Sequence, residues 1–354
     1  MAPCDLHLRF TGLRGSTVEG SLSLIARSAV VLSRISISLR GTSTTLITST
    51  GTKGTPMSYS EEHIIIDEVH TVSTKYTELS TGDHHFPFAF SLPDYTQCKP
   101  SKGQLHVHGP LPPSYTSPYL QIRYQLTATV YFKKSLFGSK LTKSLVVPLN
   151  PPQAVTSASN RNTLIQKKFT IPPPPEPPKS FISYLIFGED EPKPQRPLVF
   201  EIRCAGVLQL GGPLPLDMSF VSKSITRLNL QKVTISLKCI MSIRAKGLVK
   251  NLVQWVTLCD VISSERLHLT DGRAVIPKSV YDSVVTGIPK SFKVCNAITS
   301  YELHVQCEVS GVASLTSETV NVKKAVEVVE HDLPSYDEVV GPQMSSAGIV
   351  KAAQ

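Results

Sequence analysis

The sequence has no long hydrophobic run. Nowhere does it reach the stretch of about 18 apolar residues that a membrane-spanning helix needs. It contains no Asn-x-Ser/Thr glycosylation sequon. Its first residues, Met1 to Asp5, lack the basic region and apolar core of a secretory signal. These absences favour a soluble chain, and we expect it to stay in the cytosol.

Cysteine is present without any of the patterns that give it a structural or metal-binding role. The seven cysteines are an odd number and include no C-x-x-C pair, which argues against a disulfide framework and against a zinc site. His106 and His108 would share one face of a strand, but no Asp, Glu or Cys lies close in sequence to complete a site. We therefore expect no metal and no cofactor. Cys239 and Cys307 fall on the apolar face of strand patterns and are expected to be small core residues.

Catalytic and nucleotide-binding motifs are also missing. There is no phosphate-binding loop, no G-x-G-x-x-G between a strand and a helix, no nucleophile elbow and no H-E-x-x-H. The sequence therefore predicts a protein that is not an enzyme. The net charge of +9 is spread along the chain and is not interleaved with aromatics, which argues against nucleic-acid binding. The charge still permits acidic membrane surfaces and acidic partner segments.

Apolar residues recur at every second position, the period of a half-buried β-strand. Phe86, Phe88, Phe90 and Leu92 share one face, and the prolines beside them favour a strand near the edge of its sheet. Residues 120–132 alternate over thirteen positions, the clearest strand of the chain. Similar patterns at 18–24, 34–40, 198–203, 233–239 and 301–309 indicate an all-β fold with two β-sandwiches. Residues 41–60, rich in Thr, Ser and Gly, are expected to form hairpin tips or a loop.

A change in composition separates the two sandwiches. Residues 172–178 hold six prolines in seven positions, and a polyproline II segment serves as a semi-rigid spacer because it cannot join a sheet. The tail is acidic and polar with little periodicity, so it is expected to be flexible. The predicted organisation is an N-terminal sandwich at 1–150, a Pro-rich linker at 151–197, a C-terminal sandwich at 198–325 and a tail at 326–354.

Several motifs of the chain resemble those of arrestins. The F-P-F-A-F-S-L-P run at 86–93 is similar to a signature of arrestin N-terminal domains. The segments L-P-P-S-Y at 111–115 and I-R-Y-Q-L at 122–126 resemble those that follow it, and residues 291–296 and 300–303 are similar to closing strands of the arrestin C-terminal domain. The resemblance spans roughly residues 5 to 325. Among arrestins the chain looks like the α-arrestins, the arrestin-related trafficking adaptors common in fungi.

The resemblance implies a function as well as a fold of two tandem arrestin-type sandwiches. Members of that group bind the WW domains of Nedd4-type HECT ubiquitin ligases through PPxY or L-P-x-Y motifs. They direct ubiquitination of plasma-membrane transporters and receptors, followed by endocytosis and sorting. A cytoplasmic adaptor recruited to the plasma membrane and endosomes is therefore expected. The alternative keeps the fold without the ligase, as an arrestin-fold sorting or scaffold protein.

Two tyrosine motifs compete for the WW domain. A WW ligand must be a short accessible polyproline II turn, with a proline between aromatic rings and a tyrosine in a second pocket. Pro112-Pro113-Ser114-Tyr115 has the strict spelling, but it leads directly into the strand at 120–132, where its tyrosine is expected to be packed. Leu333-Pro334-Ser335-Tyr336 has the relaxed spelling and lies in the tail. Context favours Leu333, Pro334 and Tyr336 over Pro112, Pro113 and Tyr115.

A basic hairpin is predicted after the strand at 120–132. It carries Lys133, Lys134, Lys140 and Lys143 around Phe137-Gly138. A solvated turn accounts for these charges, and the functional alternative is contact with acidic lipid headgroups, where each lysine contributes about 1 kcal/mol.

Overall fold

A computed structural model describes residues 4–50, 54–73, 76–98, 109–133, 140–152, 162–172, 196–312 and 316–330. Over these ranges the chain is built of β-strands with one short 3-10 turn, η1 (Lys278–Val280), so the predicted all-β fold is confirmed. In the same ranges no helix has the length and apolar character needed to span a membrane.

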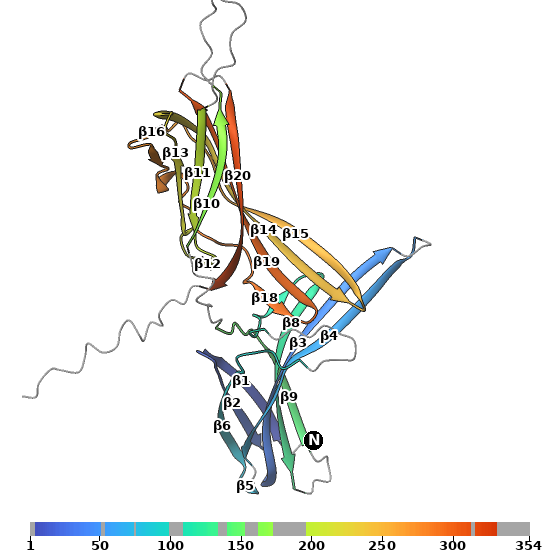
Figure 1. Cartoon of the computed structure of the whole chain (residues 1–354). Coiled ribbons are helices and arrows are strands. Elements are labelled where there is room, and N and C mark those ends of the chain that lie inside the picture. Colours follow the sequence, from blue (N-terminus) through green and yellow to red (C-terminus); the bar gives the residue numbers. More distant parts are fainter. Residues whose placement is uncertain are drawn as a thin grey trace, which may run out of the picture.

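The N-terminal half forms one sandwich (Figure 1). A three-stranded sheet in the order β1-β2-β6 lies opposite a six-stranded sheet in the order β4-β3-β8-β7, with β5 paired to β3 and β9 paired to β8. All of these pairs are antiparallel. The strands are β1 (Cys4–Arg14), β2 (Thr17–Ala26), β3 (Val30–Thr50), β4 (Pro56–Ser73), β5 (Thr77–Leu79), β6 (Gly82–Ser91), β7 (Tyr115–Thr116), β8 (Leu120–Phe132) and β9 (Lys140–Val147).

The period-two patterns account for the burial of these strands. Strand β8 spans the predicted 120–132, and every second side chain from Leu120 to Phe132 is buried. Strand β6 carries the phenylalanine run: Phe88 is buried, and Phe86 and Phe90 pack on the same core. Because β6 is the last strand of its sheet, Pro87 sits where a missing backbone donor is tolerated. The edge position predicted from the prolines is confirmed.

The C-terminal half forms a second sandwich. A four-stranded sheet in the order β10-β11-β13-β17 faces a seven-stranded sheet. Five strands of the larger sheet follow the order β12-β20-β19-β14-β15, and the other two are β16, which pairs with β14, and β18, which pairs with β19. Only β12 and β20 pair in parallel among the described strands of this half. The strands are β10 (Thr163–Ile171), β11 (Arg196–Cys204), β12 (Val207–Leu210), β13 (Leu216–Val221), β14 (Arg227–Ala245), β15 (Leu248–Ile262), β16 (Arg266–His268), β17 (Arg273–Val275), β18 (Phe292–Val294), β19 (Ala297–Gly311) and β20 (Ser317–Glu330).

Three segments differ from the sequence-based expectation. Strand β10 lies inside the span expected to be linker, residues 151–197, and pairs with β11 along its whole length. Strand β20 runs to Glu330, so residues 326–330 are sheet and not tail. Most of the span 41–60 is also strand, because Thr and Ser fit a pleated surface and some of them are needed for contacts inside the protein.

Two hydrophobic cores result, and one of them is shared between the halves. The C-terminal core is built from residues of that half alone. The N-terminal core also receives side chains from the C-terminal half, from the end of β14, from β18 and from the start of β19. These are Met241, Ile243, Ala245, Phe292, Val294 and Ala297. The two sandwiches are therefore joined by a buried apolar contact.

Candidate functional site: the junction between the halves

The junction is centred on Asn296, in the turn between β18 and β19. Its side chain is almost fully buried against β3 of the other half. Ser43 Oγ donates a hydrogen bond to Asn296 Oδ1 (2.7 Å), and Asn296 Nδ2 donates to the carbonyl oxygen of Ser43 (2.9 Å). Thr45 Oγ1 donates to the carbonyl of Arg244 (2.5 Å). Buried polar groups are stable only when hydrogen-bonded, so these pairs define how the two surfaces meet.

The strict PPxY motif is part of the fold beside this junction. Tyr115 lies in β7, and its ring packs on Phe292 of the C-terminal half with ring centroids 5.9 Å apart. Burial raises the pKa of the Tyr115 hydroxyl. Pro112 is buried, and its carbonyl accepts a hydrogen bond from the hydroxyl of Tyr124 (2.7 Å).

Ser114 fastens the middle of the same motif. Its backbone N–H donates to the carbonyl of Leu149 (2.7 Å), and its Oγ accepts a hydrogen bond from the Leu149 N–H (2.9 Å). A WW domain could grip this motif only after these bonds and the packing of Tyr115 were broken.

The last described strand ends at the junction as well. The Glu330 carboxylate forms an ion pair with Lys290, which is 4% exposed. It also accepts hydrogen bonds from the Nδ2 of Asn150 (2.6 and 2.5 Å), which follows β9 of the N-terminal half. The carboxyl end of β20 is thus fastened to both halves.

The contacts of Glu330 with Lys290 and Asn150, called the Glu330 clamp below, predict that substitutions of Glu330 and of Lys290 change stability by different amounts. We expect Glu330→Ala to lower the free energy of unfolding by about 2 kcal/mol, because it leaves the buried Lys290 ammonium without a counter-charge. The loss is smaller than for a fully buried pair, because Glu330 is partly exposed and water screens the interaction. Lys290→Met removes the buried charge and should change stability by less than about 1 kcal/mol. Urea unfolding followed by circular dichroism measures both. Equal losses for the two variants would contradict the clamp.

The remaining expected site residues are distributed as follows. Lys133, Lys140 and Lys143 are exposed at the far end of β8 and β9, and Lys133 Nζ lies 4.8 Å from the ring centroid of Tyr76. Lys134 lies outside the described residues, as do His106 and His108 and the whole of Leu333, Pro334 and Tyr336. The structure therefore brings Pro112, Pro113 and Tyr115 to the junction and keeps the described lysines apart from it.

Three potential metal ligands meet at the junction, and sequence spacing did not reveal them. His63 comes from β4, Cys98 from the chain after β6, and Cys295 from the β18–β19 turn. All three are buried, and their donor atoms lie within 4.8 Å of one another. The signal is absent from the sequence because the three residues belong to segments far apart in the chain. Cys239 and Cys307, by contrast, are buried in the C-terminal core as predicted.

Comparison with known proteins identifies the first sandwich. Residues 10–149 match the family described as arrestin (or S-antigen), N-terminal domain. No curated protein matches the chain. An arrestin-type domain is a non-catalytic adaptor fold, so the match supports an adaptor or scaffold role in general.

Proposed function

We propose that the chain is an arrestin-like protein, and more specifically an α-arrestin that recruits a Nedd4-type HECT ubiquitin ligase to membrane cargo. The cargo would be plasma-membrane transporters or receptors, whose ubiquitination leads to endocytosis and sorting. The proposed site of action is the cytoplasmic face of the plasma membrane and of endosomes.

The observation that carries the proposal is the contrast between the two tyrosine motifs. Pro112 to Tyr115 is held by the Tyr124 hydroxyl, by Leu149 and by Phe292, so its turn is committed to the fold. The relaxed motif begins three residues after Glu330, where β20 is clamped to both halves. We propose that Leu333, Pro334 and Tyr336 form the ligase-binding motif beside the junction.

Exposed lysines mark the part of the N-terminal sandwich that we propose faces the membrane. Lys133, Lys140 and Lys143 are exposed on the N-terminal sandwich at the end of β8 and along β9. We propose that they contact acidic lipid headgroups, each contributing about 1 kcal/mol near the charged leaflet. Figure 1 shows this end of β9 far from the end of β20, which would leave the ligase-binding motif clear of the bilayer.

A titration of WW domains tests the proposal. Purified WW domains of a Nedd4-type ligase are titrated into the full chain by calorimetry, and we expect micromolar binding, a binding free energy of about 8 kcal/mol. Tyr336→Ala should raise the dissociation constant above about 1 mM, because the tyrosine pocket of the WW domain is left empty. Tyr115→Ala should bind as the parent does, once circular dichroism shows that it has folded. Tyr76→Ala, an exposed tyrosine elsewhere, is the control.

The alternative function is sorting or scaffolding without the ligase. Two observations favour it. The residues of the strict PPxY motif are packed and hydrogen-bonded within the fold, and the tail motif has Leu333 in place of the first proline. A parent chain that binds no WW domain would select this alternative. Binding that is lost only in Tyr115→Ala would overturn the assignment to Tyr336.

A further inference from the structure

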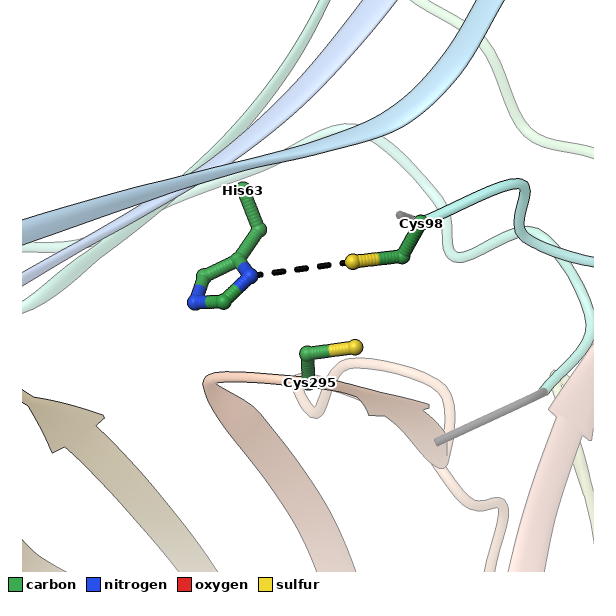
Figure 2. A group of neighbouring side chains, drawn as sticks. All are labelled: His63, Cys98 and Cys295. Atoms are coloured by element: carbon green, nitrogen blue, oxygen red, sulfur yellow. Dashed lines mark hydrogen bonds between the residues drawn. The ribbon is translucent and has the colours of Figure 1, made fainter. Parts of the chain in front are cut away.

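The cluster of His63, Cys98 and Cys295 lies where the two halves meet and takes no part in the proposed ligase recruitment (Figure 2). Figure 2 shows the three side chains directed toward one another, His63 and Cys98 from the N-terminal half and Cys295 from the C-terminal half. His63 Nδ1 lies 3.6 Å from Cys98 Sγ. The three donors thus surround one small buried space.

The separations suit a tetrahedral metal ion. With Zn–N bonds of about 2.0 Å and Zn–S bonds of about 2.3 Å, a tetrahedral zinc holds its nitrogen and sulfur ligands about 3.5 Å apart and two sulfurs about 3.8 Å apart. The observed 3.6 Å between His63 Nδ1 and Cys98 Sγ matches the first of these distances. The upper bound of 4.8 Å for the set leaves only a small side-chain adjustment to close the site.

The imidazole of His63 is already oriented for coordination. Its Nε2 lies 2.6 Å from Glu61 Oε1, so an Nε2–H donated to that carboxylate leaves the Nδ1 lone pair directed at the cysteines. Glu61 is held in turn by the backbone N–H of Lys246, which donates to Glu61 Oε2 (2.5 Å). A carboxylate that orients a histidine in this way is the usual outer partner of a metal ligand.

The two thiols need a cation if they are to be charged. Two neighbouring buried thiolates repel each other, whereas a divalent ion would neutralise both. Binding would release the two Sγ–H protons to solvent as two metal–sulfur bonds form.

We propose that His63 Nδ1, Cys98 Sγ and Cys295 Sγ bind one Zn²⁺ that joins the two halves of the chain. One nitrogen and two sulfur donors are the set that zinc prefers, whereas magnesium and calcium require oxygen. The described residues supply three ligands, and solvent or a further donor takes the fourth position. The ion would pin the β18–β19 turn, which carries Asn296 and follows the core residue Phe292 of β18, onto the N-terminal sandwich.

Metal analysis of the intact full-length chain is the first test. The reduced protein is dialysed with Zn²⁺, freed of excess metal and measured for zinc per chain; one ion per chain is expected. Replacement by Co²⁺ should give the visible bands of a tetrahedral ion and a thiolate charge-transfer band. X-ray absorption at the zinc edge should count two sulfur ligands. Removal of the ion with a chelator should lower the melting temperature, because only the folded state holds the site.

Matched variants assign the ion to these residues. Cys98→Ser and Cys295→Ser should each lose the cobalt charge-transfer intensity and the bound zinc. Cys259→Ser is the control: Cys259 is equally buried but donates to the Val280 carbonyl, a bond that serine can replace, and its zinc should be retained. Glu61→Gln keeps an oxygen acceptor for His63 but removes the charge, and it should weaken zinc binding about 10- to 100-fold.

Three outcomes would overturn the proposal. The first is an intact, reduced chain that retains no zinc after dialysis. The second is zinc that survives both Cys98→Ser and Cys295→Ser. The third is a metal-free chain in which mass spectrometry finds Cys98 and Cys295 joined as a disulfide under reducing conditions that keep Cys259 free. None of these results depends on WW-domain binding, so the zinc site and the ligase proposal fail separately.

Discussion

Replacing Tyr124 by alanine is expected to lower the free energy of unfolding of the N-terminal sandwich by about 3–5 kcal/mol. Tyr124 is fully buried at the centre of β8, and its ring fills the space beside Gly41 and Ile66, where even an added Cβ at Gly41 would clash. The cavity left by alanine is held open by the sheet, because β8 pairs at this position with β3 on one side and with β9 on the other. Urea unfolding followed by circular dichroism measures the loss.

The conservative variant Tyr124→Phe separates the hydroxyl from the ring. It keeps the packing but orphans the buried carbonyl of Pro112, and it should cost about 1–3 kcal/mol. Hydrogen exchange at the Ser114 amide should speed up, because the turn loses one of its anchors. Tyr95→Phe, at an exposed tyrosine, should stay within about 0.5 kcal/mol of the parent. If Tyr124→Phe unfolds like the parent, the hydroxyl does not hold the motif.

The second large effect is expected at Asn296. Asn296→Ala removes the acceptor for Ser43 Oγ and the donor for the Ser43 carbonyl, and both groups stay buried after losing that partner. Each orphaned group costs about 1–3 kcal/mol, so we expect a loss of at least about 2 kcal/mol. The loss should be accompanied by faster proteolysis between the two halves, since Asn296 lies at their contact.

An exposed asparagine gives the matched control. Asn251 accepts a hydrogen bond from Ser242 Oγ (2.7 Å) at the surface, and Asn251→Ala should change stability by less than about 0.5 kcal/mol. Thermal unfolding of the two variants and the parent under one buffer compares them. Similar melting temperatures for Asn296→Ala and Asn251→Ala would show that the buried bonds at the junction contribute little.

Local periodicity was enough to predict the strands. Apolar side chains alternate along 86–92 and 120–132 whatever the neighbouring strands are, because the side-chain period of an extended backbone is two. Pro87, between Phe86 and Phe88, and Pro93, after Leu92, predicted an edge strand for the same reason, since the missing donor is a property of the residue itself. The all-β class and the edge position of β6 were therefore readable without a structure.

Segment boundaries were less predictable where composition misled. Strand β10 was hidden between two proline-rich stretches, and its own pattern, with exposed lysines in the middle, does not alternate clearly. The Ser- and Thr-rich span after Gly41 suggested hairpin tips or a loop, yet Ser43 and Thr45 are buried within a strand. Their partners come from the other half: Asn296 in the β18–β19 turn for Ser43, and the Arg244 carbonyl at the end of β14 for Thr45. A polar residue in a strand is buried only when a distant segment satisfies it, and no local pattern records that.

The sequence by itself determined the period of the strands, the edge position of the phenylalanine strand and the spelling of both tyrosine motifs. Only the tertiary structure decided that Tyr115 is packed on Phe292 and that β20 ends on Lys290 and Asn150. It also decided that His63, Cys98 and Cys295 face one another. The physical reason is the same in each case: Tyr115 with Phe292, Glu330 with Asn150, and the cluster of His63, Cys98 and Cys295 all join residues of the two halves. Chain spacing carries no information about which distant segments a folded core brings together.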